Sequence, residues 1–269
     1  MNGVSFLAMQ NNNTNAIPNK LARALQHWAC YICDVMRSQI LNEGSIKYAI
    51  SEYLEVAKIQ KPLNTNSIAP TISEYKFEST HPVFISRTID LKINYTNQDK
   101  NYESYYEFKY ARERNISKAE SARYIDDIFR LATLVMNNHS YEAYFLLVGP
   151  KQLVESLFSV GNNVATIQYP QIRKKGDIEA YKDNVQRMLS LDKEHPTRTF
   201  RPSDLKPYDK KEQIVRFTED YGKIRVATPP YIVIQSTTEI TTELIHSNSE
   251  TASHDDIIVT VWRILDVKT

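Results

Sequence analysis

Two runs of side chains between positions 87 and 110 alternate with a period of two residues, the pattern of β-strands. In the first run Ile89, Leu91 and Ile93 point one way, and Asp90 points the other. A polar loop rich in Asn, Asp and Lys joins the two runs. This pattern predicts a β-hairpin.

The second run places charged side chains on one face of the hairpin. Because successive residues of a strand point to opposite faces, Glu107 and Lys109 share one surface, and Tyr106 and Phe108 share the other. If the two runs pair, Asp90 reaches the surface of Glu107 and Lys109. Two carboxylates and one ammonium group would then gather on the sheet.

Helical patterns precede the hairpin. A first helix is predicted at 18–38 and a second at 45–59, each with apolar side chains at intervals of three and four residues. A polar linker follows at 62–70, and a strand is predicted at 72–77. A regular amphipathic helix therefore lies shortly before the strands.

Helix and strand patterns also follow the hairpin. Ser117 and Glu120 form a capping box that opens a helix extending to Met136. The apolar run 144–148 predicts a strand buried on both faces, followed by a short helix at 152–158. The order helix, three strands, helix, strand predicts an α/β fold, an α/β/α sandwich around a central mixed β-sheet. The long helix would be a right-handed crossover.

The composition changes in the C-terminal part of the chain. The segment 171–216 contains twelve Lys and Arg residues against eight Asp and Glu, and one helix is predicted at 177–191. Strand patterns then return in KIRVA, YIVIQSTTEI and IIVTVWRIL. We expect three parts: a flexible N-terminus at 1–17, a core at 18–165, and a β-rich α+β extension at 166–269. The extension either completes the same domain or forms a lobe that binds substrate or a partner.

The composition limits the classes of protein to which this chain can belong. A hydrophobic fraction of 42% and a net charge of +1 fit a globular protein rather than a wholly basic coat protein for nucleic acid. The chain has six glycines and contains neither GxGxxG nor GxxxxGK followed by Ser or Thr, which excludes these phosphate-binding loops. Cys30 and Cys33 share a helix face without a second pair, so we expect buried, reduced thiols. No run approaches the ~18 apolar residues of a membrane span, so we expect a cytoplasmic protein.

Asp90, sixteen intervening residues and then Glu107-Phe108-Lys109 resemble the signature of the PD-(D/E)xK nuclease superfamily. Members of this superfamily share the restriction-endonuclease-like fold. Ile89 stands where a proline often precedes the aspartate. The order of helix, hairpin, crossover helix and apolar strand over residues 43–149 also matches the family, so the resemblance covers less than half of the chain.

The resemblance implies a Mg²⁺- or Mn²⁺-dependent endonuclease that hydrolyses phosphodiester bonds in DNA, in restriction or anti-phage defence, with RNA left open as a substrate. Asp90, Glu107 and the backbone carbonyl of Phe108 would bind the metal ion. Lys109 would orient the attacking water or offset charge on the phosphate, which makes Asp90, Glu107 and Lys109 the catalytic candidates. These residue types suit the chemistry, because Mg²⁺ prefers oxygen ligands and a bound divalent ion activates water.

Many members of this superfamily add an acidic ligand from the helix before the sheet, and Glu43 and Glu52 are the candidates. At about 100° per residue, Glu43 lies about 60° from Ile46, the centre of the apolar stripe, whereas Glu52 lies about 120° away. We therefore favour Glu43. An acid stabilised by the dipole at a helix N-terminus accounts for Glu43 almost equally well.

The other charged residues have alternative explanations. The hairpin charges themselves could be solvent-facing residues of an amphipathic sheet. Asp126 and Arg130 stand four residues apart in the crossover helix and predict a surface ion pair with a structural role. A third set either contacts a phosphate backbone or forms solvated surface: Arg173, Lys174, Lys175, Arg198 and Arg201.

Two other functions stay open at this point. One is a non-cleaving nucleic-acid-binding or assembly subunit on the same fold, with the C-terminal extension as a partner surface. The other is an effector that a sensor or ATPase partner activates, since the chain has no nucleotide-binding motif of its own. A nuclease could also act as a homodimer, whose geometry would set blunt or staggered ends.

Overall fold

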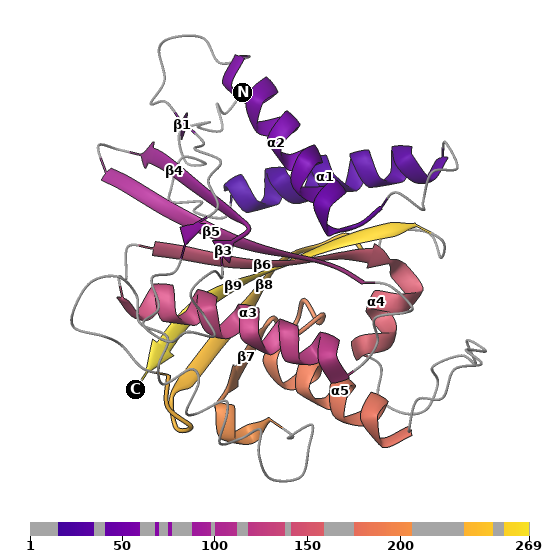
Figure 1. Ribbon diagram of the computed structural model, residues 1–269, viewed down its shortest axis with the longest axis vertical. Helices are drawn as coiled ribbons and strands as arrows, with labels where there is room; N and C mark the ends of the chain where they lie inside the picture. Colours follow the sequence, from indigo (N-terminus) through magenta and orange to yellow (C-terminus); the bar gives the residue numbers. More distant parts are fainter. Residues whose placement is uncertain are drawn as a thin grey trace, which may run out of the picture.

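A computed structural model describes residues 16–34, 41–59, 68–69, 75–76, 88–97, 100–111, 118–137, 141–158, 175–205, 234–249 and 256–268. These residues form three layers, one mixed β-sheet with helices on both faces (Figure 1). This arrangement confirms the α/β class and the mixed sheet expected from the sequence. Of the helices in the described part of the chain, none is both long and apolar enough to cross a membrane.

The sheet contains seven strands in the order β1-β4-β5-β6-β9-β8-β7. The expected hairpin is present, because β4 (Leu91–Asn97) pairs antiparallel with β5 (Lys100–Tyr110). β5 pairs parallel with β6 (Tyr141–Pro150), and β6 pairs antiparallel with β9 (Ile257–Lys268). The remaining strands of the sheet are β1 (Ile68–Ala69), β8 (Glu239–Ser247) and β7 (Thr197–Phe200), and a separate ladder joins β2 (Tyr75–Lys76) to β3 (Thr88–Ile89).

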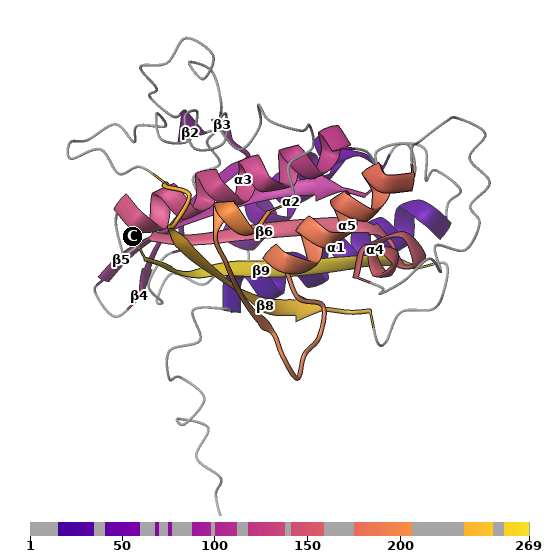
Figure 2. The ribbon, with the colours of Figure 1, turned by 90° about the horizontal axis from the view of Figure 1, so that it is seen from below.

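Helices cover both faces of the sheet (Figures 1 and 2). On one face lie α1 (Ala16–Asp34) and α2 (Glu43–Ile59), and on the other lie α3 (Lys118–Asn137), α4 (Lys151–Phe158) and α5 (Lys175–Met188). Each corresponds to a helix predicted from the sequence, with ends shifted by a few residues. The helix α3 connects the parallel strands β5 and β6, as expected for a crossover.

β6 shows how one sheet serves two hydrophobic cores. Its side chains alternate between the core beside α3, α4 and α5 and the core beside α1 and α2. Both sets are fully buried, which explains the unbroken apolar run. The first core receives Ala143, Phe145 and Leu147, and the second receives Tyr144, Leu146 and Val148.

The C-terminal strands continue this sheet, because β9 lies directly beside β6. The pattern at 257–265 correctly predicts β9. Of the strand predicted at 231–240, only 239–240 belong to β8, and 231–233 lie outside the described residues. A turn at 235–238 precedes β8, where Gln235 N–H donates to Thr238 Oγ1 at 2.8 Å. The strand predicted at 72–77 is described only as β2, and the KIRVA run lies outside the described residues.

Candidate functional site

The charged residues predicted from the sequence, Asp90, Glu107 and Lys109, lie where the pairing of β4 with β5 ends. The last pair between the two strands is Leu91 with Tyr106, whereas β5 continues beside β6 through Tyr110. Residues 107–110 of β5 therefore have β6 on one side and no β4 on the other. Asp90 forms a bend at this point, between β3 and β4.

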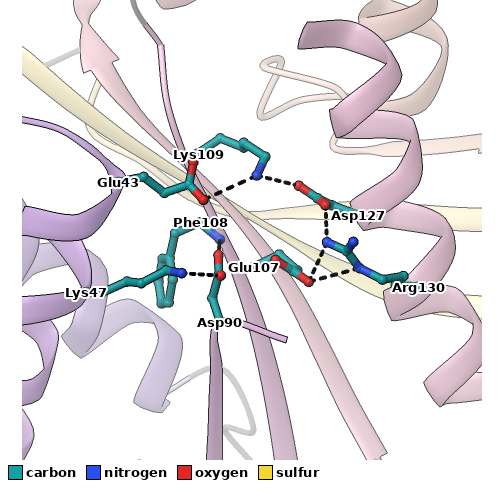
Figure 3. Close-up of polar contacts among 8 residues, drawn as sticks. All are labelled: Glu43, Lys47, Asp90, Glu107, Phe108, Lys109, Asp127 and Arg130. Atoms are coloured by element: carbon teal, nitrogen blue, oxygen red, sulfur yellow. Dashed lines mark hydrogen bonds and ion pairs between the residues drawn. The ribbon is translucent and has the colours of Figure 1, made fainter. Parts of the chain in front are cut away.

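Asp90 occupies the end of the ladder between β4 and β5. Its Oδ2 accepts a hydrogen bond from the Phe108 N–H at 2.8 Å, and its Oδ1 lies 2.6 Å from the Lys47 ammonium of α2 (Figure 3). The N–H and C=O of one strand residue point to the same edge of the strand. The carbonyl of Phe108 is therefore directed to the edge that Asp90 occupies.

The bend changes the alternation expected for the first run. Ile89 packs in the core beside α3, whereas Leu91 and Ile93 pack in the core beside α1 and α2. The prediction that these three side chains face the same way is wrong, because the bend at Asp90 interrupts the period of two. In the second run the period holds, since Tyr105 packs on the α3 side and Phe108 on the α2 side.

Glu107 is almost completely buried, with 1% of its surface exposed. Its Oε1 accepts hydrogen bonds from Nε and Nη2 of Arg130 on α3, at 3.2 and 2.8 Å. Burial and the nearby charge of Asp127 raise the pKa of the Glu107 carboxyl well above its ordinary value, although Arg130 opposes them. The expected position of Glu107 on the sheet is therefore correct, but the side chain faces a helix rather than solvent.

Lys109 reaches both neighbouring helices. Its Nζ lies 2.8 Å from Asp127 Oδ2 on α3 and 3.5 Å from Glu43 Oε1 on α2. Burial alone would lower the pKa of the Lys109 ammonium, but the charges of Asp127 and Glu43 outweigh burial and raise it above its ordinary value. Lys109 is therefore a fixed positive charge between two helices.

A capping pair places the first turn of α2 at the site. Asn42 Oδ1 accepts a hydrogen bond from the Ser45 N–H at 3.0 Å, and Ser45 Oγ accepts one from the Asn42 N–H at 2.9 Å. The helix begins at Glu43, two residues earlier than predicted. Glu43 and Lys47 stand four residues apart, so they share the helix face that meets Lys109 and Asp90.

Arg130 pairs with an aspartate of α3 that the sequence did not single out. The structure joins Arg130 to Asp127, three residues before it, and both side chains are buried. The predicted partner, Asp126, belongs to α3, but its side chain lies outside the described residues. The predicted surface position is wrong for Arg130, because its side chain is buried against Glu107 of β5. No periodic signal in the sequence singles out Asp127, because α3 buries both Ile125 and Ile128 around it.

The side chains around Asp90, Glu107 and Lys109 form a charged cluster of four carboxylates and three cations. Within the described residues, no three side chains of His, Cys, Asp or Glu lie close enough together to hold a metal ion. Each carboxylate of the cluster meets a cation instead (Figure 3). The carboxylates belong to Glu43, Asp90, Glu107 and Asp127, and the cations to Lys47, Lys109 and Arg130.

The predicted basic residues lie elsewhere or outside the described part. Arg198 lies on β7, the opposite edge strand from β1, and Arg201 follows it. Arg198 Nη1 donates to the carbonyls of His195 and Thr197 at 3.2 and 3.0 Å, and Arg201 pairs with Glu239. Lys175 begins α5 without a described side chain, whereas Arg173 and Lys174 fall outside the described residues, and so does the side chain of Glu52.

Cys30 and Cys33 are both free thiols, and burial together with nearby acidic charge raises the pKa of each. Both side chains are half-buried, so the prediction that they are buried is wrong. Comparison of the chain with models of protein families, with curated proteins and with solved structures gave no match.

Proposed function

We propose that this protein is a divalent-metal-dependent endonuclease that hydrolyses phosphodiester bonds in DNA, on a restriction-endonuclease-like core. The observation that carries the proposal is the meeting of Asp90, Glu107 and Lys109 where β4 leaves β5. The order α2, β4, β5, α3, β6 and the parallel pairing of β5 with β6 support it. A role in restriction or anti-phage defence follows from family analogy.

The donor atoms at this strand edge suit Mg²⁺ or Mn²⁺ in kind. Asp90 and Glu107 offer carboxylate oxygens, the Phe108 carbonyl is directed to the same edge, and the cluster of Figure 3 contains neither thiol nor imidazole. In the described arrangement Lys47 holds Oδ1 of Asp90 and Arg130 holds Oε1 of Glu107, so an ion would displace Lys47 from Asp90 and would bind Glu107 through its other oxygen. A bound divalent ion would supply an activated water and neutralise charge on the phosphate.

The protein's own groups would bind and orient the substrate. The Lys109 ammonium is a point charge fixed between α2 and α3, and it would offset negative charge on the phosphate or orient the attacking water. Glu43 and Lys47 form the accessible side of the cluster, with 43% and 37% of their side chains exposed. Substrate would therefore approach past the first turn of α2.

Cleavage assays test this proposal. The protein is incubated with plasmid, linear duplex, single-stranded DNA and RNA, each with Mg²⁺ or Mn²⁺. We expect DNA cleavage that falls by roughly 100-fold or more in Asp90→Asn and Lys109→Gln, because each removes a charge from the reacting centre. Lys92→Gln is the matched control, because Lys92 lies on the same hairpin and pairs with Glu103 at 3.0 Å. Undiminished cleavage in both site variants would sink the proposal.

A second candidate is a non-cleaving nucleic-acid-binding or assembly subunit on the same fold. The pairing of Asp90 with Lys47 and of Glu107 with Arg130 favours it, since a purely structural cluster needs no further cation. Calorimetric titration with Mg²⁺ separates the two candidates. Binding that Asp90→Asn weakens supports the nuclease, whereas no binding at millimolar Mg²⁺ favours the second candidate.

A further inference from the structure

Asp127 joins two cations of the cluster. Its side chain is 3% exposed, with Oδ2 lying 2.8 Å from the Lys109 ammonium and Oδ1 meeting Nη2 of Arg130. Both contacts come from one carboxylate on α3 (Figure 3). The position of the Lys109 ammonium therefore depends on a residue of another element.

Arg130 completes the connection between α3 and β5. Its Nε and Nη2 donate to Glu107 Oε1 at 3.2 and 2.8 Å. Two residues three apart on the helix thus hold two residues two apart on the strand: Asp127 holds Lys109, and Arg130 holds Glu107. Because the two spacings match, one face of α3 holds the side chains of both Glu107 and Lys109.

We propose that Asp127 and Arg130 are positioning residues for the reaction proposed above, with Asp127 setting the place of the Lys109 ammonium and Arg130 that of the Glu107 carboxylate. The inference rests on the proposed function. It gives a role in the site to two residues outside the D…ExK pattern.

Stability alone is a weak reason for such a cluster. Removing charges from water costs several kcal/mol per ion, and buried ion networks can often be replaced by apolar side chains without loss of stability. What the network does supply is orientation, because Lys and Arg have long side chains whose rotamers the partner carboxylates restrict. Orientation matters for rate, since a misplacement of about 1 Å can cost about 100-fold.

Asp127→Asn is the primary test, because it keeps the shape of the side chain and removes the charge that holds Lys109. We expect kcat for DNA cleavage to fall by about 10- to 100-fold, with KM for DNA changed by less than about threefold. Arg130→Lys is the second variant and should also lower kcat, because a lysine keeps the charge but not the two donors that reach Glu107. It takes the place of Asp127→Asn if that variant does not fold.

Thr133→Val is the matched control. Thr133 is buried on the same helix and donates from Oγ1 to the Phe129 carbonyl at 2.8 Å, and among the described residues it makes no hydrogen bond to the charged cluster. We expect thermal denaturation to show lost stability in this variant, with kcat within about twofold of the wild type. A loss of kcat in the control equal to that in Asp127→Asn would mean that any disturbance of α3 matters, and would overturn the inference.

A readout in the metal-free protein does not depend on cleavage. The ammonium of Lys109, held by a buried carboxylate, should give a slowly exchanging ¹⁵N–H NMR signal that Lys109→Gln removes and so assigns. We expect Asp127→Asn to lose or shift this signal and Thr133→Val to keep it. An unchanged signal in folded Asp127→Asn, or a lost signal with unchanged kcat, overturns the inference. Absence of cleavage by the wild type sinks the proposed function instead.

Discussion

The ammonium of Lys47 lies 2.6 Å from Oδ1 of Asp90, and the other carboxylate oxygen accepts the Phe108 N–H. Burial alone would lower the pKa of Lys47, but the hydrogen bond and charge of Asp90 outweigh burial and raise it. Lys47 is therefore a cation in direct contact with the first proposed metal ligand. A divalent ion would have to compete with it.

We predict that Lys47→Met binds Mg²⁺ or Mn²⁺ more tightly than the wild type. The ion no longer has to displace an ammonium group from Asp90. Because a partly exposed ion pair is worth up to ~1 kcal/mol, the gain in affinity should be roughly two- to fivefold. Isothermal titration calorimetry in the metal-free protein measures it.

Lys92→Met separates this effect from a general loss of positive charge. Lys92 lies two residues after Asp90 but pairs with Glu103, and the centroid of the Tyr105 ring is 5.4 Å from its Nζ. We expect the metal affinity of this variant to match the wild type. An equal gain in both variants, or weaker binding in Lys47→Met, would contradict the prediction.

The sequence correctly predicted those elements in which burial determines the order of apolar and polar residues. The run 144–148 falls within β6 because a strand buried on both faces needs uninterrupted apolar side chains. The strand prediction was wrong at 234–238, because β-branched residues favour a strand without fixing where it begins. In the first part of β8 every second side chain is buried, at Ile240, Thr242 and Leu244, and this alternation begins only after the turn.

Some residues of the candidate site could be placed from the local pattern of the sequence, and others could not. Glu107 and Lys109 could be placed on one face because the period of a strand is fixed. Asp127 could not, because α3 buries Ile128 as well as Ile125, and an apolar stripe then no longer shows which polar residue points inward. The contact of Lys47 with Asp90 depends on a bend and on the placement of α2 against the sheet. Neither is encoded in local periodicity.

Asn42→Ala should weaken the first turn of α2. The variant loses the Oδ1 acceptor for the Ser45 N–H, and removal of such a cap costs about 1 kcal/mol. Urea denaturation measures this cost, and Asn42→Asp, which keeps an acceptor, should stay within about 0.5 kcal/mol of the wild type. If the proposed function holds, fraying also loosens Glu43 and Lys47 and lowers kcat. Equal stability of the Ala and Asp variants would show that the cap is not significant.

Gly149→Ala should destabilise the junction of β5 and β6. A Cβ at this position would lie 2.7 Å from Ala111 Cβ and 3.1 Å from the Ala111 carbonyl oxygen. The backbone cannot easily move apart, because Ala111 N–H donates to the Val148 carbonyl at 2.7 Å. We expect a loss of about 1–3 kcal/mol in chemical denaturation. Adding Ala111→Gly should recover part of it, and a double variant no more stable than Gly149→Ala would contradict this steric account.

His246 should make stability depend on pH. Its Nε2 is buried without a hydrogen-bond partner among the described residues, and burial lowers the pKa of the ring, as do the charges of Arg23 and Lys193. Below the ordinary pKa near 6.5, the unfolded chain takes up a proton more readily than the native protein, so stability falls as the pH drops through this range. Urea denaturation at pH 7.5 and 5.5 should show a smaller loss in His246→Leu than in the wild type. Equal losses in the two proteins would assign the pH dependence to other groups.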